Sequence, residues 1–224
     1  MVSIVLLQND PLVGEGLRKA LSTEPGLHVI GMATSLSQAR QCLERARVDL
    51  LVADLRIGNE RLAELLRKRH DGGLQGRTLV LAITMSPEDP QLMQALRQGA
   101  DGYFVHGSTM KALAGVIRQV LAGESPMSPQ IARRLQAHFK CDDWTLSGVH
   151  RKTLPMPQVP QLAQTPSLTD AERQMLNRVS QGYLLHEIAR EMQTSEHSVG
   201  LKTRSLYRKL QLDVRGGALL SQAA

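Results

Sequence analysis

Residues 168–212, LTDAERQMLNRVSQGYLLHEIAREMQTSEHSVGLKTRSLYRKLQL, decide the fold of the C-terminal part of the chain. Apolar residues recur there at helical spacing in three segments, and a turn of four residues separates the second segment from the third. The third segment carries four Lys and Arg residues between His197 and Lys209, and no Asp or Glu. A basic helix that packs against a second helix across a tight turn suits the major groove of DNA. The pattern predicts a helix-turn-helix.

Local signals mark the ends of these helices. Thr169 and Glu172 have the spacing of a capping box at the start of the first helix. Gly182 suits the end of that helix, and Ser195 suits the start of the third. The expected inner faces are Met175, Leu176 and Val179 in the first helix, Ile188, Ala189 and Met192 in the second, and Val199, Leu206 and Leu210 in the third.

The whole chain of 224 residues is basic, with a net charge of +6 and a pI near 9.7. Its length allows one large or two small domains, and its charge favours an anionic partner. The two cysteines, Cys42 and Cys141, form no CxxC or Cys/His cluster, so we expect no metal site and a reduced, cytoplasmic protein. The N-terminus lacks the features of a signal peptide, and no apolar run reaches the roughly 18 residues that span a membrane.

The N-terminal part alternates apolar runs with amphipathic segments. Runs at 4–7, 28–33, 50–53, 79–83 and 102–105 are almost continuously apolar, as strands covered on both faces are. Five strands that alternate with five helices predict a doubly wound parallel sheet. One expected helical stripe consists of Leu12, Val13, Gly16, Leu17, Ala20 and Leu21.

These patterns divide the chain into four parts. We expect an α/β domain over 1–123, a connecting helix over 124–140, a proline-rich linker over 141–166 and an all-α domain over 167–224. In an open parallel sheet the site lies beyond the carboxyl ends of the strands. The polar residues at those ends are Gln8, Asn9, Asp10, Asp54, Thr84 and His106.

The segments DPLVGEGLRKAL (10–21), VDLLVADLR (48–56), ALRQGADGYFVHG (95–107) and the 168–212 stretch occur in the order and spacing of a known family. In these motifs the chain resembles a two-component response regulator of the NarL/LuxR type. The resemblance implies a flavodoxin-like receiver domain with a five-stranded sheet, followed by a four-helix LuxR-type helix-turn-helix. It also implies that Asp54 is the phosphoacceptor position and that Thr84 and Tyr103 are the switch positions.

The chain departs from the family at the residues that support phosphorylation. Gln8 and Asn9 stand where the family has an acidic pair that binds Mg²⁺, and His106 stands where it has a lysine. Magnesium prefers several hard oxygen ligands, and the transfer of a phosphoryl group depends on charge neutralisation. We therefore expect a pseudo-receiver with no cofactor, in which Asp54 is vestigial; Mg²⁺ enters only if the conventional mechanism holds.

The resemblance places His197, Ser198, Lys202 and Arg204 toward the DNA groove, with Arg208 and Lys209 as further basic contacts. Gly200 and Leu201 occupy positions where the family usually has Lys and Thr. Leucine cannot donate a hydrogen bond to a base edge, and glycine weakens a helix interior. No nucleophile–base pair or metal cluster is evident in the sequence, so we do not expect an enzyme.

The sequence thus predicts a transcriptional regulator that binds promoter DNA as a homodimer without phosphorylation of Asp54. Its input would be a protein partner, a small ligand at the pseudo-receiver, or the protein level. One alternative is a conventional regulator that phosphorylation activates. Another is an interaction protein, in which the pseudo-receiver binds a partner regulator and the helix-turn-helix serves mainly for dimerisation.

Overall fold

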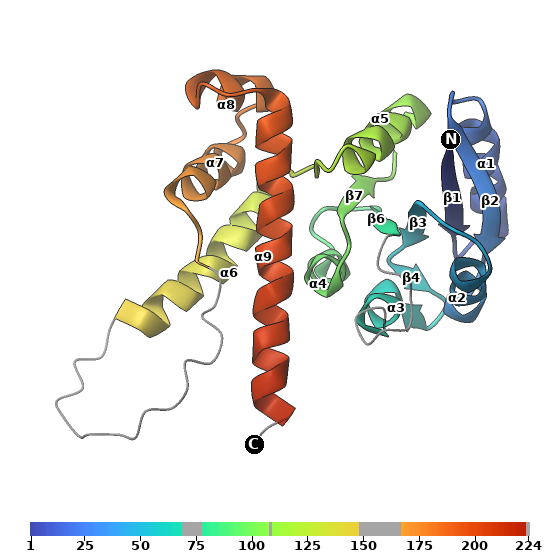
Figure 1. The fold of residues 1–224 in the computed structure, drawn as a ribbon, viewed down its shortest axis with the longest axis horizontal. Coiled ribbons are helices and arrows are strands. Elements are labelled where there is room, and N and C mark those ends of the chain that lie inside the picture. Colours follow the sequence, from blue (N-terminus) through green and yellow to red (C-terminus); the bar gives the residue numbers. More distant parts are fainter. Residues whose placement is uncertain (69–77, 108, 148–166, 223–224) are drawn as a thin grey trace.

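A computed structural model describes residues 1–68, 78–107, 109–147 and 167–222 (Figure 1). Its N-terminal domain contains one five-stranded parallel sheet with the strand order β2-β1-β3-β6-β7. The strands are β1 (Val2–Leu7), β2 (Leu27–Ala33), β3 (Leu50–Asp54), β6 (Leu79–Thr84) and β7 (Gly102–Val105). The order reverses direction at β1, which makes the sheet doubly wound and confirms the predicted fold class.

Helices cover both faces of this sheet, as the unbroken apolar strands require. They are α1 (Pro11–Ser22), α2 (Leu36–Arg45), α3 (Leu62–Lys68), α4 (Pro90–Gln98) and α5 (Met110–Leu121). A short hairpin that the sequence analysis did not predict follows β3, formed by β4 (Arg56–Ile57) and β5 (Glu60–Arg61). Gly58 has a φ of 58° in its turn, a conformation that glycine adopts without strain.

The predicted inner face of α1 was partly wrong. The buried residues are Gly14, Leu17 and Leu21, whereas Leu12 is 81% exposed. Gly14 lies so close to the neighbouring strand that a Cβ atom there would come within 2.9 Å of the Met32 side chain. Gly14, Leu17 and Leu21 form the inner face, so Leu12 faces outward although it belongs to the apolar pattern.

The C-terminal domain is helical, as predicted, and consists of α7 (Asp170–Gln181), α8 (Leu185–Glu191) and α9 (Glu196–Gln222). The expected third and fourth helices form one continuous helix of 27 residues, α9. The connecting helix α6 (Pro129–Ser147) extends seven residues beyond its predicted end at 140. The proline-rich part of the predicted linker, 148–166, lies outside the described residues.

The core of the C-terminal domain contains the apolar residues that helical spacing predicted. Met175, Leu176, Ile188, Val199, Leu206 and Leu210 are all buried. Tyr207, which the pattern did not single out, is fully buried beside them. In Figure 1, α9 lies between the N-terminal domain and the pair α6 and α7, and it packs against α4 as well as α8. The two domains therefore meet along α9.

The predicted capping box is present at the start of α7. Thr169 Oγ1 accepts from the Glu172 backbone N–H (3.3 Å), and the Glu172 carboxylate accepts from the Thr169 N–H (2.8 Å). Glu172 also receives hydrogen bonds from Ser205 (3.0 Å) and Lys209 (2.5 Å) on α9. Burial by itself would raise the pKa of Glu172, but these hydrogen bonds outweigh it and hold the pKa below its ordinary value. Glu172 therefore joins α7 to α9.

We expect Glu172→Gln to lower the free energy of unfolding by about 1–3 kcal/mol at neutral pH. A depressed folded-state pKa stabilises the fold above the ordinary glutamate pKa, and this stabilisation is lost as the pH falls through the folded-state value. The difference between wild type and variant, measured by urea denaturation at several pH values, should shrink in acid. The matched control is Glu187→Gln, where an exposed carboxylate accepts from the Leu184 N–H. Equal losses in both variants would contradict a special role for Glu172.

Candidate functional site

A pocket of about 360 Å³ opens at the carboxyl ends of β1, β3 and β6. It brings together four of the residues that the sequence analysis singled out: Asn9, Asp54, Thr84 and His106. The remaining lining residues are Val13, Leu55, Arg56, Ile83, Met85 and Asp89. Gln8 and Tyr103 do not line this pocket.

The two residues at the acidic-pair positions have separate local roles. Gln8 is buried, and its Nε2 donates to the Leu7 carbonyl (3.0 Å). The Asn9 backbone N–H donates to Asp54 Oδ2 (2.9 Å), and Asn9 Oδ1 accepts from the Gly58 N–H (2.7 Å). The Asn9 side chain is thus used to hold the β4–β5 hairpin beside Asp54.

Two other carboxylates, Asp10 next to Asn9 in the chain and Asp89 in the pocket lining, serve as helix caps. Asp10 Oδ1 accepts from the Leu12 N–H (2.8 Å) at the start of α1. Asp89, which lines the pocket, accepts from the Gln91 N–H (2.8 Å) at the start of α4. Within the described ranges, no group of three or more His, Cys, Asp or Glu residues could hold a metal ion. These donors do not fit the Mg²⁺ ion that the family resemblance implies.

Asp54 lies in a partly desolvated environment. Burial raises the pKa of its carboxyl above the ordinary value, while the Asn9 N–H and the electrostatic attraction of His106 oppose this rise. The raised pKa means that ionised Asp54 destabilises the fold. This cost is absent below the ordinary aspartate pKa and develops as the pH rises through the folded-state value.

The two switch positions are buried and hydrogen-bonded. Thr84 Oγ1 donates to the Ser86 carbonyl (2.8 Å), next to the pocket. The Tyr103 hydroxyl accepts from the Ser128 N–H (2.7 Å) at the start of α6. Tyr103 therefore connects the last strand of the sheet to the helix that leads toward the C-terminal domain.

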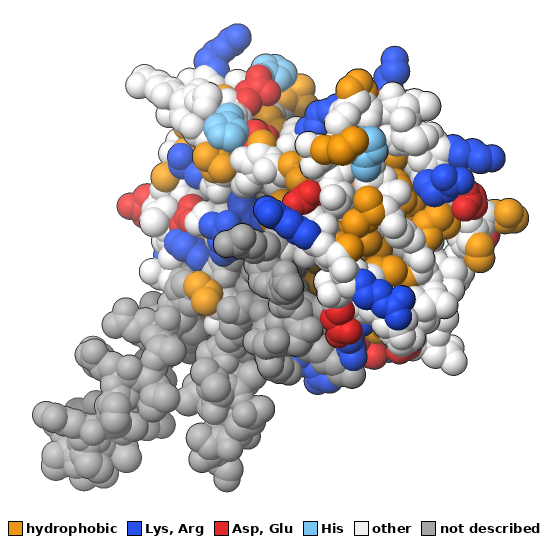
Figure 2. All heavy atoms as spheres, turned by 45° about the vertical axis from the view of Figure 1, so that its right-hand side comes forward, with side chains coloured by type: hydrophobic (Ala, Val, Ile, Leu, Met, Phe, Trp, Pro, Cys, Tyr) orange, Lys and Arg blue, Asp and Glu red, His pale blue; other side chains and the backbone are white. Residues whose placement is uncertain are grey.

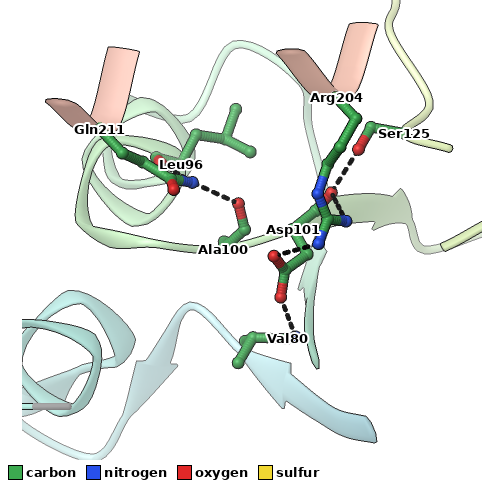
Figure 3. A network of polar contacts seen from close by, with 7 residues as sticks. All are labelled: Val80, Leu96, Ala100, Asp101, Ser125, Arg204 and Gln211. Carbon is green, nitrogen blue, oxygen red and sulfur yellow. Dashed lines mark hydrogen bonds and ion pairs between the residues drawn. The ribbon is translucent and has the colours of Figure 1, made fainter. Parts of the chain in front are cut away.

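The face of α9 that carries Arg204 contacts the N-terminal domain, and one of its contacts is a buried ion pair with Asp101 (Figure 3). Arg204 Nη2 lies 2.5 Å from Asp101 Oδ1, and Arg204 Nη1 donates to the Asp101 carbonyl (3.1 Å). The exposed fractions of the two side chains are only 7% and 13%. Asp101 is fixed further because its Oδ2 accepts from the Val80 N–H (2.6 Å) and its carbonyl accepts from Ser125 Oγ (2.6 Å).

Three more residues of α9 extend this interface along the helix with hydrogen bonds. Gln211 Nε2 lies 3.2 Å from the carbonyl oxygens of both Leu96 and Ala100, at the end of α4 (Figure 3). The Tyr207 hydroxyl donates to the Pro126 carbonyl (2.8 Å). At the start of α9, His197 Nδ1 lies 2.6 Å from Glu124 Oε1. In this closed arrangement, residues 197–211 pack against the N-terminal domain.

The six predicted DNA-binding residues differ in their surroundings. His197 and Arg204 contact the N-terminal domain, and Lys209 is paired with Glu172. Ser198 Oγ lies 2.9 Å from Ser195 Oγ, Lys202 is half-buried and Arg208 is exposed. On the face drawn in Figure 2, Lys and Arg side chains are scattered among hydrophobic ones and form no continuous basic surface among the described residues. Contact of Arg204 with DNA requires α9 to leave the closed arrangement.

Sequence reasoning missed the partners of α9 in the N-terminal domain. Asp101 lies 103 residues before Arg204 in the chain, and Glu124 lies 73 residues before His197. Pairs of this separation produce no local pattern. The residues on the α9 side do share a helical face, since Arg204, Tyr207 and Gln211 follow one another at spacings of three and four.

Two family models match the two domains. The receiver domain of response regulators matches residues 4–118, and the LuxR family of bacterial regulatory proteins matches residues 166–219. The class defined by this fold and site is therefore a response regulator with a helix-turn-helix. The chain belongs to the LuxR-family DNA-binding response regulators, with an N-terminal receiver. No helix in the described ranges is long and apolar enough to cross a membrane.

Named relatives are similar over both domains. The chain is 26% identical over 213 residues to the nitrate/nitrite response regulator protein NarL of Escherichia coli (strain K12). The aligned residues make up 95% of this chain and 91% of that protein. It is 30% identical over 215 residues to the DNA-binding transcriptional activator DevR/DosR of Mycobacterium tuberculosis, covering 96% and 91%. A LuxR-family response regulator from Aurantimonas sp. SI85-9A1 aligns with a TM-score of 0.55 at 28% identity, over 62% of this chain and 97% of that one.

Proposed function

We propose that this chain is a transcriptional regulator that acts without phosphorylation of Asp54. The observation that carries the proposal is the hydrogen bond of the Asn9 side chain. Asn9 occupies a position where the family has an acidic Mg²⁺ ligand, but its Oδ1 accepts from the Gly58 N–H instead. With Gln8 buried and Asp10 capping α1, Asp54 has no acidic neighbour from the β1–α1 loop. Position 106, where the family has a lysine, is a histidine in this chain.

The DNA-reading surface in this proposal is the face of α9 that contains His197, Ser198, Lys202, Arg204 and Arg208, with Lys209 beside it. Two copies of the chain would place two such helices in successive turns of the major groove of promoter DNA. The support is the basic helix and the similarity to DevR/DosR, which is described as a DNA-binding transcriptional activator. We further propose a cytoplasmic, non-enzymatic protein whose input is a protein partner or a small ligand at the pseudo-receiver.

We expect Asp54→Asn to leave DNA affinity and oligomeric state unchanged and to raise the melting temperature slightly. The substitution removes a partly desolvated charge, and the amide can still accept from the Asn9 N–H. The measurements are a binding isotherm on a mixed-sequence DNA duplex, sedimentation, and thermal denaturation at neutral pH. Glu64→Gln, on α3, is the control for the loss of one carboxylate. A clear loss of DNA affinity only in Asp54→Asn would contradict the proposal.

A second candidate function is an interaction protein, and the closed arrangement favours it, because Arg204 is engaged by Asp101 rather than by solvent. Salt dependence separates the two candidates. If Lys and Arg residues of α9 bind phosphates, log Kd rises linearly with log salt concentration, and Lys202→Ala lowers the slope by about one. If neither the salt concentration nor Lys202→Ala changes the Kd for DNA, the interaction protein is favoured.

A further inference from the structure

Gly200 lies in the first turns of α9 at a very close approach to the receiver. A Cβ atom at this position would meet three side-chain atoms of Glu124: Cγ at 2.8 Å, Cβ at 2.9 Å and Oε2 at 2.9 Å. Separations below 3.0 Å essentially do not occur for real Cβ atoms. Two of the three atoms lie at the base of the glutamate side chain, so a small rotation of its carboxylate cannot remove the overlap. Only glycine fits here while Glu124 stays in place.

The surrounding contacts belong to the same close fit. His197, three residues earlier, lies 2.6 Å from the other carboxylate oxygen of Glu124. The Ser125 N–H donates to the Gly200 carbonyl (3.3 Å), which is a backbone contact between the two domains. Gly123, which precedes Glu124 in the chain, also lies near α9, because a Cβ atom on Gly123 would be 3.6 Å from the Leu201 side chain. Residues 123–125, which follow α5, thus match the surface that residues 197–201 present.

This match gives a physical reason for the two residues that depart from the family pattern in α9. A glycine inside a helix weakens it relative to alanine, and Leu201 offers no hydrogen bond to a base edge. Both fit the segment between α5 and α6, and Gly200 allows the backbones to approach closely enough for the Ser125 hydrogen bond.

We infer that Gly200 is a docking notch for Glu124, and that its missing side chain sets the balance between the closed arrangement and an open one. Any side chain at this position pushes α9 away from residues 123–125 and strains the neighbouring Arg204–Asp101 pair. The open arrangement then gains population, and the basic face of α9 becomes accessible. The consequence for DNA rests on the proposed function, whereas the notch itself does not.

The test is Gly200→Ala in the full chain. Hydrogen–deuterium exchange of the peptide 197–211 should rise, because overpacking a tight contact shifts the equilibrium toward the open arrangement. Affinity for a mixed-sequence DNA duplex should increase about tenfold. A folding defect is not expected, since alanine favours a helix more than glycine does. Gly115→Ala in α5 is the matched control, because a Cβ there meets nothing within 4 Å.

A double-variant cycle locates the cause. In a Glu124→Gly background the overlapping atoms are gone, so Gly200→Ala should change exchange and affinity much less than in wild type. Unchanged exchange of 197–211 in Gly200→Ala, or equal effects in both backgrounds, would overturn the notch. If hydrogen–deuterium exchange rises in Gly200→Ala but DNA binding does not tighten, the notch is supported and the proposal that α9 reads DNA is contradicted. The two proposals can therefore fail separately.

Discussion

In the full chain, Asp101→Asn is expected to tighten the binding of a DNA duplex by roughly 100-fold or more, because removing one partner of a buried ion pair costs about 3–5 kcal/mol. That cost falls on the closed arrangement, since only there is Arg204 buried against Asp101. The asparagine side chain keeps an oxygen that can accept from the Val80 N–H, so the receiver itself should remain folded. The binding isotherm is the measurement, with thermal denaturation as a check on folding.

The control for Asp101→Asn is Glu15→Gln, which makes the same change in net charge. Glu15 pairs with Arg18 on the exposed surface of α1, where an ion pair contributes little. Its affinity for DNA should match that of wild type. If Asp101→Asn binds DNA no more tightly than Glu15→Gln, the receiver does not restrain α9 through this pair.

The second large effect is expected from Arg204→Ala in the Asp101→Asn background. In this open background the loss of an arginine that contacts phosphate or guanine should weaken DNA binding by about 10- to 100-fold. In the wild-type background the same substitution both opens the interface and removes the contact, so the two effects partly cancel. The open background therefore isolates the contribution of Arg204 to DNA binding. The isotherms should be measured at two or more salt concentrations.

Arg18→Ala in the same Asp101→Asn background is the matched control, because it removes one exposed arginine from the receiver. It should leave the affinity close to that of Asp101→Asn alone. If Arg204→Ala does no more than Arg18→Ala, Arg204 holds the closed arrangement but does not bind DNA.

The sequence predicted the strands and most of the helices because their patterns are local. Strands covered on both faces, such as 50–53, read as continuous apolar runs, and the capping residue Thr169 acts within one turn of its helix. The same reasoning misplaced Leu12. Apolar spacing alone does not reveal that Gly14, which has no side chain, lies on the buried face of α1 in place of Leu12.

The pocket residues could also be predicted, because the carboxyl ends of parallel strands meet at one edge of the sheet. Asn9, Asp54, Thr84 and His106 come together for this reason. The role of the Asn9 side chain could not be predicted, since it depends on a hairpin whose strands are two residues long.

The interface between the domains lay beyond sequence reasoning altogether. The Arg204–Asp101 pair joins residues on different domains, and Arg204 read simply as part of a basic helix. Gly200 was interpreted as a weakness in DNA recognition. In the structure it fits the receiver closely, which a single sequence does not indicate.

We propose that this regulator works without a phosphoryl group on Asp54. The most direct test is the Kd of the wild-type full chain for a DNA duplex, measured with and without acetyl phosphate and Mg²⁺. We expect the same Kd in both conditions and no added phosphoryl mass on the intact protein. Tight binding that requires the phosphodonor, with a phosphoryl mass that disappears in Asp54→Asn, would contradict it.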